Sequence, residues 1–204
     1  MSLHPVLPVL DDLARVIGGM APEHDTAPTP CEGLDVIGLR RHLLGGIGYF
    51  TVVLADPADD RRGRPDPRAY VGPDEPEVLR TAIELLSGAV RAALADGVET
   101  VSVKVPDLGG TFPGDHVLSM LLAEAVVHGW DAARATGQSW QPDPAASEVA
   151  HALLAQQIKP EYRGGEGMPF AAEVPVHASA PALDRLLGFA GRSPDWRRPA
   201  VEQG

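Results

Sequence analysis

Residues 117–133 read VLSMLLAEAVVHGWDAA, a stretch that is apolar on every side of a helix. A surface helix carries its apolar residues on one face only, so this helix is expected to be largely buried. The helix is predicted to span residues 115–135, because Gly137 is a residue type that favours the end of a helix.

Three ionisable residues interrupt this apolar stretch: Glu124, His128 and Asp131. At about 100° per residue, the second and third lie about 40° and −20° around the helix from the first, so all three share one stripe. A buried carboxylate is costly without a partner, and Glu and His four residues apart direct their donor atoms at one point. The pair therefore predicts two ligands of a metal ion, although a Glu and a His could also simply bond to each other.

Helical spacing of apolar residues recurs elsewhere in the chain. It predicts helices over residues 5–20, 35–55, 76–95 and 144–158, and a short last helix starting near Ser179 and Pro181. Residues 99–105 predict a short extended segment, and residues 57–75 and 106–115 predict loops rich in Pro, Gly and Asp. The whole chain, residues 1–204, is expected to be a single all-α domain.

A third metal ligand is expected from another helix, because two ligands hold an ion poorly. His42 lies on an apolar stripe of the predicted helix 35–55, together with Gly46 and Tyr49. Gly46 removes side-chain bulk one turn after His42, which would leave room for an ion or a ligand. The predicted metal ligands are therefore His42, Glu124 and His128, with Gly46 and Tyr49 as candidates for the surrounding pocket. The alternative for His42 is a hydrogen-bonded core histidine, since a single His on an apolar face is more often that than a ligand.

Four further residues have weaker claims to a role at the site. Asp131 either orients a ligand histidine or serves as a buried hydrogen-bonding residue near the helix end. His116 either borders the pocket or caps its helix. Cys31 stands in a proline-containing turn with no activating neighbour in the sequence, so a structural role is expected. Arg134 is expected to interact with the C-terminal end of its own helix.

Composition excludes several classes of function. Lys and Arg total 17 against 28 Asp and Glu, a net charge of −11 that repels phosphate backbones, so no nucleic-acid partner is expected. The single cysteine allows no intramolecular disulfide and indicates a reducing compartment. The chain has neither a signal-peptide pattern nor an apolar run of membrane-spanning length, so a cytoplasmic protein without a membrane partner is expected. Nothing in the sequence indicates the oligomeric state.

Two segments resemble the signatures of the mycothiol-dependent maleylpyruvate isomerase and DinB-like metal-binding superfamily. They are TPCEGLDVIGLRRHLLGG, residues 29–46, and LLAEAVVHGWDAARATGQ, residues 121–138. The tail APALDRLLGFAGRSPDW, residues 180–196, resembles the ending of one metal-binding subfamily of that group. The resemblance implies a four-helix bundle, a divalent ion on His42, Glu124 and His128, and a low-molecular-weight thiol such as mycothiol as cosubstrate.

The chain departs from these patterns in two places. Leu34 stands where the first signature usually carries Trp, which is expected to alter packing more than metal binding. The region after Tyr162 is shorter than the additional C-terminal domain of the isomerase proper, which indicates the small subfamily without that domain.

Two histidines and one carboxylate leave coordination positions open for a small molecule. The leading hypothesis is a metal-dependent transferase or isomerase in which a thiol attacks an electrophilic small molecule. Zinc is the expected ion, with nickel and iron as alternatives. The alternative functions are a metal-dependent hydrolase, an iron oxygenase using the same ligands, and a metal-loaded protein that binds a small molecule without turnover.

Overall fold

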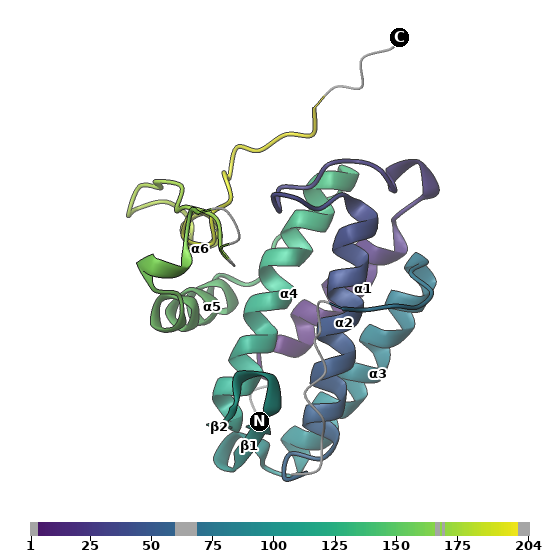
Figure 1. Ribbon diagram of the computed structural model, residues 1–204, viewed down its shortest axis with the longest axis vertical. Helices are drawn as coiled ribbons and strands as arrows, with labels where there is room; N and C mark the ends of the chain where they lie inside the picture. The colour runs from purple at the N-terminus through teal and green to yellow at the C-terminus, as the bar shows by residue number, and fades with distance from the viewer. Residues whose placement is uncertain (1–3, 60–68, 166–167, 169, 200–204) are drawn as a thin grey trace.

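Four long helices form the centre of the structure, a computed structural model that describes residues 4–59, 69–165, 168 and 170–199. They are α1 (Val6–Gly18), α2 (Val36–Ala55), α3 (Pro76–Ala95) and α4 (Gly114–Thr136). α1 and α2 each pack against both α3 and α4, and the four helices lie side by side in Figure 1. The predicted all-α, DinB-like class is confirmed.

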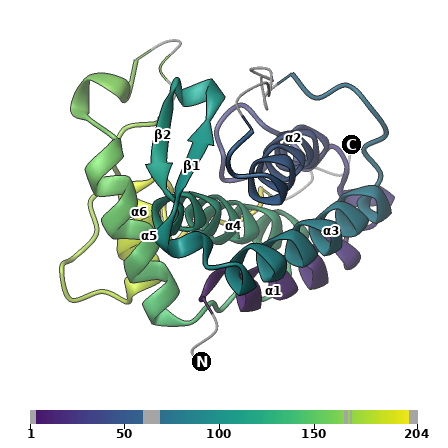
Figure 2. The same cartoon turned by 90° about the horizontal axis from the view of Figure 1, so that it is seen from below.

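The apolar stretch of the sequence forms α4, which is buried along most of its length. Figure 2 shows α4 in the middle, with α5 and α6 on one side and α1, α2 and α3 on the other. Gly137 ends α4 with a φ of 71°, a left-handed conformation that glycine adopts without steric cost. The prediction that this helix is largely buried is confirmed.

Local sequence features account for where the other long helices begin and pack. Val6, Leu10, Leu13 and Ile17 form one apolar stripe of α1, and each is at most 1% exposed. Asp35 caps α2, because its Oδ1 accepts the backbone N–H of Gly38 at 2.7 Å. The first and last residues of α1, α2 and α3 lie within two residues of the predicted helix ends.

A short hairpin follows α3 and precedes α4. Residues 98–100 form a 3₁₀ turn, and β1 (Ser102–Val105) pairs antiparallel with β2 (Gly110–Pro113), with Val103 opposite Phe112. The predicted extended segment over residues 99–105 is confirmed for β1 but wrong at residues 99 and 100, which belong to the 3₁₀ turn. The prediction of a loop over residues 106–115 is wrong at β2. β2 carries no run of buried apolar residues, so its strand pairing depends on the reversal at Gly109, where φ is 66°.

The C-terminal part of the chain packs on the outside of α4. α5 (Pro144–Gln157) lies against α4, and α6 (Ala182–Phe189) lies against α5. The residues after α6 then return to α4, where the Arg198 guanidinium donates to the carbonyl of Ala135 at 3.3 Å. This return places a segment from the end of the chain beside the C-terminal half of α4.

Of the predicted loop over residues 57–75, residues 60–68 lie outside the described part of the chain. The remainder, residues 57–59 and 69–75, contains neither helix nor strand. Among the residues that the structure describes, no helix has the length and apolar character needed to cross a membrane.

Candidate metal centre

Three side chains predicted to bind a metal meet between α2 and α4. The Nε2 atoms of His42 and His128 lie 3.1 Å apart. Glu124 Oε2 lies 3.4 Å from His42 Nε2 and 3.3 Å from His128 Nε2. Glu124 and His128 stand one turn apart on α4, and α2 supplies His42 from the facing helix.

The three donor atoms form a nearly equilateral triangle, which is the arrangement that one bound ion requires. An ion about 2.1 Å from three tetrahedral ligands holds their donor atoms about 3.4 Å apart. The observed separations of 3.1 to 3.4 Å lie close to that value. Two nitrogens and one oxygen suit a divalent ion of the zinc, nickel or iron type. The residues present therefore fit such an ion.

The site is more open than the sequence suggested. The side chain of Glu124 is 48% exposed, so the prediction that this carboxylate is buried is wrong. Glu124 borders a small apolar pocket lined by Leu13, Leu43, Gly46 and Leu121, among others. A methyl group added at Gly46 would meet no atom within 4 Å, so this glycine leaves open space beside the carboxylate, as predicted.

Charges at the site favour a protonated His128 when no ion is bound. Burial alone would lower the pKa of His128, but hydrogen bonds to Asp131 and Glu124 outweigh it and raise that pKa to about 9. Desolvation would raise the pKa of Glu124, but hydrogen bonds from His128 and His42 hold it well below its usual value. An ion that binds Nε2 of His128 must therefore displace a proton.

Asp131 supports His128 from the opposite side of the ring. Its Oδ2 lies 3.0 Å from His128 Nδ1, and its side chain is fully buried. A proton held on Nδ1 by this hydrogen bond leaves Nε2 as the atom that faces His42 and Glu124. Asp131 is therefore a buried hydrogen-bonding residue, and its contact with Nδ1 is one through which it could orient His128.

Arg192 is the functional candidate that the sequence analysis missed. Its guanidinium lies 3.0 Å from Asp131 Oδ2, although the two residues come from α4 and from the segment after α6. An Asp within an apolar helix needs a cationic partner when it is buried. This need was the one indication in the sequence that an arginine lies beside Asp131. The spacing along the chain gave no means of choosing among the arginines.

Cys31 is less isolated than expected. Its Sγ belongs to a second group of potential ligand atoms with His128 and Asp131, all within 4.8 Å of one another. Arg192 is also close enough in space to influence the thiol, although it lies far from Cys31 along the chain, so the sequence around Cys31 does not reveal this neighbour. Burial nevertheless raises the pKa of Cys31 to about 11, against the influence of Arg192. The thiol is therefore protonated at neutral pH, in accord with the structural role expected for it.

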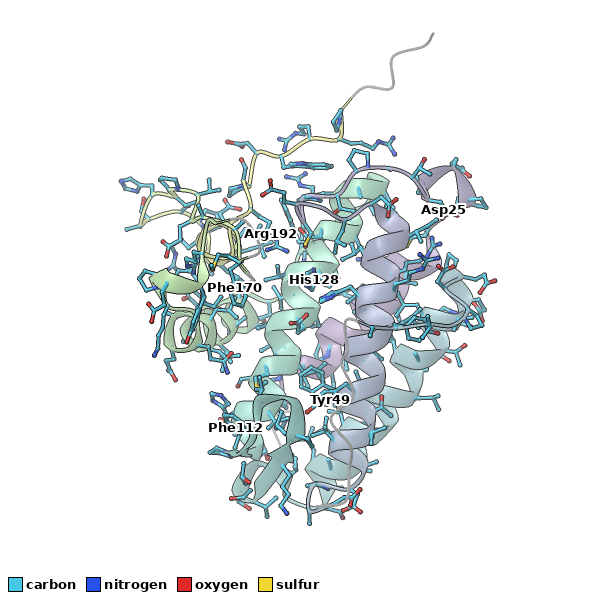
Figure 3. The ribbon with its side chains drawn as sticks, in the orientation of Figure 1. Asp25, Tyr49, Phe112, His128, Phe170 and Arg192 are labelled. Carbon is cyan, nitrogen blue, oxygen red and sulfur yellow. The ribbon has the colours of Figure 1, made fainter. Side chains whose placement is uncertain are left out.

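Two other pocket candidates, His116 and Tyr49, stand two helical turns from a predicted ligand on the same helix. The His116 ring stacks on Phe112, and its Nε2 lies 2.9 Å from Gln157 Nε2, two turns of α4 before Glu124. Tyr49 is buried two turns after His42 and packs edge-on against Phe50. Figure 3 shows Tyr49 and Phe112 well below His128, whereas Arg192 lies close to it.

Arg134 lies in the last turn of α4, and its side chain also makes contacts beyond the end of that helix. Its guanidinium donates to the carbonyl of Pro194 at 3.1 Å and lies over the ring of Trp130. It therefore helps to attach the C-terminal segment to α4.

The fold and the donor set together define a class, namely a DinB-like helical bundle with a candidate two-histidine, one-carboxylate centre. The chain belongs to the mycothiol maleylpyruvate isomerase N-terminal domain family, whose model matches residues 6–133. The matched range contains His42, Glu124 and His128, and it ends before α5, α6 and Arg192.

Two relatives are similar to the chain over nearly its full length. Both are uncharacterized proteins of Mycobacterium tuberculosis, one from strain CDC 1551 / Oshkosh and one from strain ATCC 25618 / H37Rv. Each is 27% identical over 184 residues, which cover 90% of this chain and 93% of the relative. No solved structure is significantly similar to the chain.

Proposed function

We propose that this protein is a metal-dependent enzyme that activates a low-molecular-weight thiol, such as mycothiol, for attack on an electrophilic small molecule. The reaction would be a thiol transfer or a thiol-dependent isomerisation. The observation that carries the proposal is the triangle of His42, Glu124 and His128 donor atoms, which fits one divalent ion and is open to solvent on the side of Glu124.

An open site favours catalysis over a structural role for the ion. Structural zinc sites are usually closed by four protein ligands, whereas catalytic sites keep a position for water or substrate. Asp131 is unsuited to be a fourth ligand, because its carboxylate already binds His128 Nδ1 and Arg192. We propose zinc as the ion, which when bound would lower the pKa of a thiol or a water molecule that reaches it.

The residues around the donor atoms have separate tasks in this proposal. Asp131 keeps a proton on His128 Nδ1, so Nε2 is the ring nitrogen that an ion would bind once it displaces the proton there. The apolar side chains beside Gly46 form a small apolar pocket that shields one side of the site from water. The family to which the chain belongs favours a thiol over water or oxygen as the second reactant. A cytoplasmic location would keep such a thiol reduced.

The proposal is tested by loading the protein with cobalt and adding mycothiol or a simpler thiol. We expect one ion per chain and a sulfur-to-cobalt charge-transfer band that grows with the thiol. The disulfide form of the same thiol should not produce the band.

His42→Ala should remove the ion and the band, because only two donors would remain. His177→Ala is the matched control, because His177 is exposed and bonds only locally to Ser179 in the described structure. A wild-type protein that binds cobalt but never responds to a thiol would refute the thiol proposal and favour hydrolysis, oxygen chemistry or simple binding. A protein that binds no divalent ion would refute the metal centre itself.

A further inference from the structure

The end of α6 is shaped so that Arg192 points back toward α4. Gly191 adopts a φ of 81°, and its N–H donates to the carbonyl of Gly188 at 3.0 Å. The N–H of Arg192 donates to the carbonyl of Leu187 at 2.8 Å, which closes the turn. A Cβ at position 191 would lie 2.7 Å from Ala171 Cβ, so both the conformation and the space require glycine.

The guanidinium of Arg192 binds the carboxylate of Asp131 through two nitrogens. Nη2 lies 3.0 Å from Oδ2, and Nε lies 3.4 Å from Oδ1. A third nitrogen, Nη1, donates to the carbonyl of Ala190 at 2.7 Å and fixes the plane of the guanidinium. The Arg192 side chain is only 11% exposed and that of Asp131 is fully buried, so solvent does not replace either partner.

One oxygen links this pair to the candidate metal centre. Asp131 Oδ2 lies 3.0 Å from Arg192 Nη2 and also 3.0 Å from His128 Nδ1. A carboxylate held in one plane by Arg192 therefore presents Oδ2 to the imidazole in one direction. The His128 ring is held in turn, and its Nε2 stays directed at His42 and Glu124.

We propose that Arg192 is a positioning residue of the metal centre, acting through Asp131 on His128. This inference rests on the proposed assignment of His128 as a metal ligand. Arg192 lies outside residues 6–133 that match the family model, so the segment after α6 completes a centre whose ligands come from the family domain. A purely structural ion pair would stabilise the fold without changing how tightly His128 binds an ion.

The test compares zinc affinity in the full-length wild type, Arg192→Ala, Arg192→Lys and Arg198→Ala, by competition with a chromophoric chelator. Removing a group that orients a ligand histidine typically weakens metal affinity 10- to 100-fold, and we expect a loss of about that size for Arg192→Ala. Lysine restores one charged donor but cannot bind both oxygens of Asp131 at once as the guanidinium does. Arg192→Lys should therefore recover only part of the lost zinc affinity.

Arg198→Ala is the matched control, because Arg198 attaches the same segment to α4 through Ala135 and does not reach Asp131. Its zinc affinity should stay within about twofold of wild type. Equal zinc affinity in wild type and folded Arg192→Ala would overturn the proposal. If Arg192→Ala does not fold, the test rests on Arg192→Lys. A zinc affinity of Arg192→Lys equal to that of wild type would overturn the proposal that the two-nitrogen contact with Asp131 positions His128.

A second measurement separates this inference from the proposed function. In the zinc-free protein, the Nδ1–H of His128 should give a sharp, slowly exchanging NMR signal, and Arg192→Ala should broaden it or remove it. A wild type without zinc affinity would refute the proposed function, while the ring signal would still report on Arg192. An unchanged ring signal in Arg192→Ala would overturn the inference even if the protein binds zinc.

Discussion

Zinc binding to this protein should release a proton and should therefore strengthen steeply as the pH rises. The proton comes from His128, whose pKa of about 9 means that its Nε2 is protonated in nearly every zinc-free molecule at neutral pH. Zinc and the proton compete for the same atom, so apparent affinity rises about tenfold per pH unit below that pKa. Between pH 6 and pH 8, His128 alone should strengthen zinc binding about 100-fold.

The size of this effect distinguishes the observed environment from an ordinary histidine. A histidine with a pKa near 6.5 would change the affinity only about fourfold over the same range. At pH 7.5, zinc should displace close to one proton from His128, whereas an ordinary histidine would release about a tenth of a proton. His128 releases more protons than an ordinary histidine because two carboxylates, Asp131 and Glu124, face the protonated ring and raise its pKa.

Isothermal titration calorimetry in buffers of different ionisation enthalpy measures the number of protons released per zinc. Asp131→Asn is the matched variant, because it removes one of the two charges that raise the pKa of His128 while keeping the shape of the side chain. This variant should release fewer protons at pH 7.5, whatever its absolute affinity. If the wild type released almost no proton per zinc at pH 7.5, His128 would be neutral in the zinc-free protein. That result would refute the raised pKa on which the prediction rests.

Two further predictions concern residues beside the centre. Cys31→Ser should keep its zinc and any turnover, because burial holds the thiol protonated; loss of zinc in elemental analysis would instead make Cys31 a ligand. Gly129→Ala should lower the free energy of unfolding by about 1–3 kcal/mol in urea, because its Cβ would lie 2.3 Å from the Trp140 ring. Gly88→Ala, on α3 with nothing within 4 Å, should stabilise by up to about 1 kcal/mol, and equal effects at the two glycines would contradict the packing argument.

The parts of the site that could be predicted from the sequence depend on local geometry. Glu124 and His128 stand one turn apart, and helical periodicity alone places them on one face. His42 could be added because it interrupts an apolar stripe of its own helix. The buried central helix was predictable for the same reason, since its composition leaves no polar face for solvent.

The parts that could not be predicted depend on how distant segments meet. The exposure of Glu124 reflects the open space beside Gly46 on another helix, and periodicity says nothing about that space. β2 acquires its strand conformation by pairing with β1 and carries little signal itself. The contact between Arg192 and Asp131 depends on a turn at Gly191 and on the packing of α5 and α6, neither of which a sequence motif specifies.

The charges around the candidate centre provide a reason for an anionic ligand. Asp131 and Glu124 contribute two negative charges and Arg192 contributes one positive charge, while the Cys31 thiol is neutral. With His128 protonated the group is neutral overall, and a divalent ion in place of that proton leaves one positive charge in excess. One anion, such as a deprotonated thiol, restores neutrality, whereas a neutral ligand does not. Arg192 therefore contributes twice to the proposed chemistry: it holds Asp131 in place, and its charge offsets a carboxylate that would otherwise reduce the attraction for a thiolate.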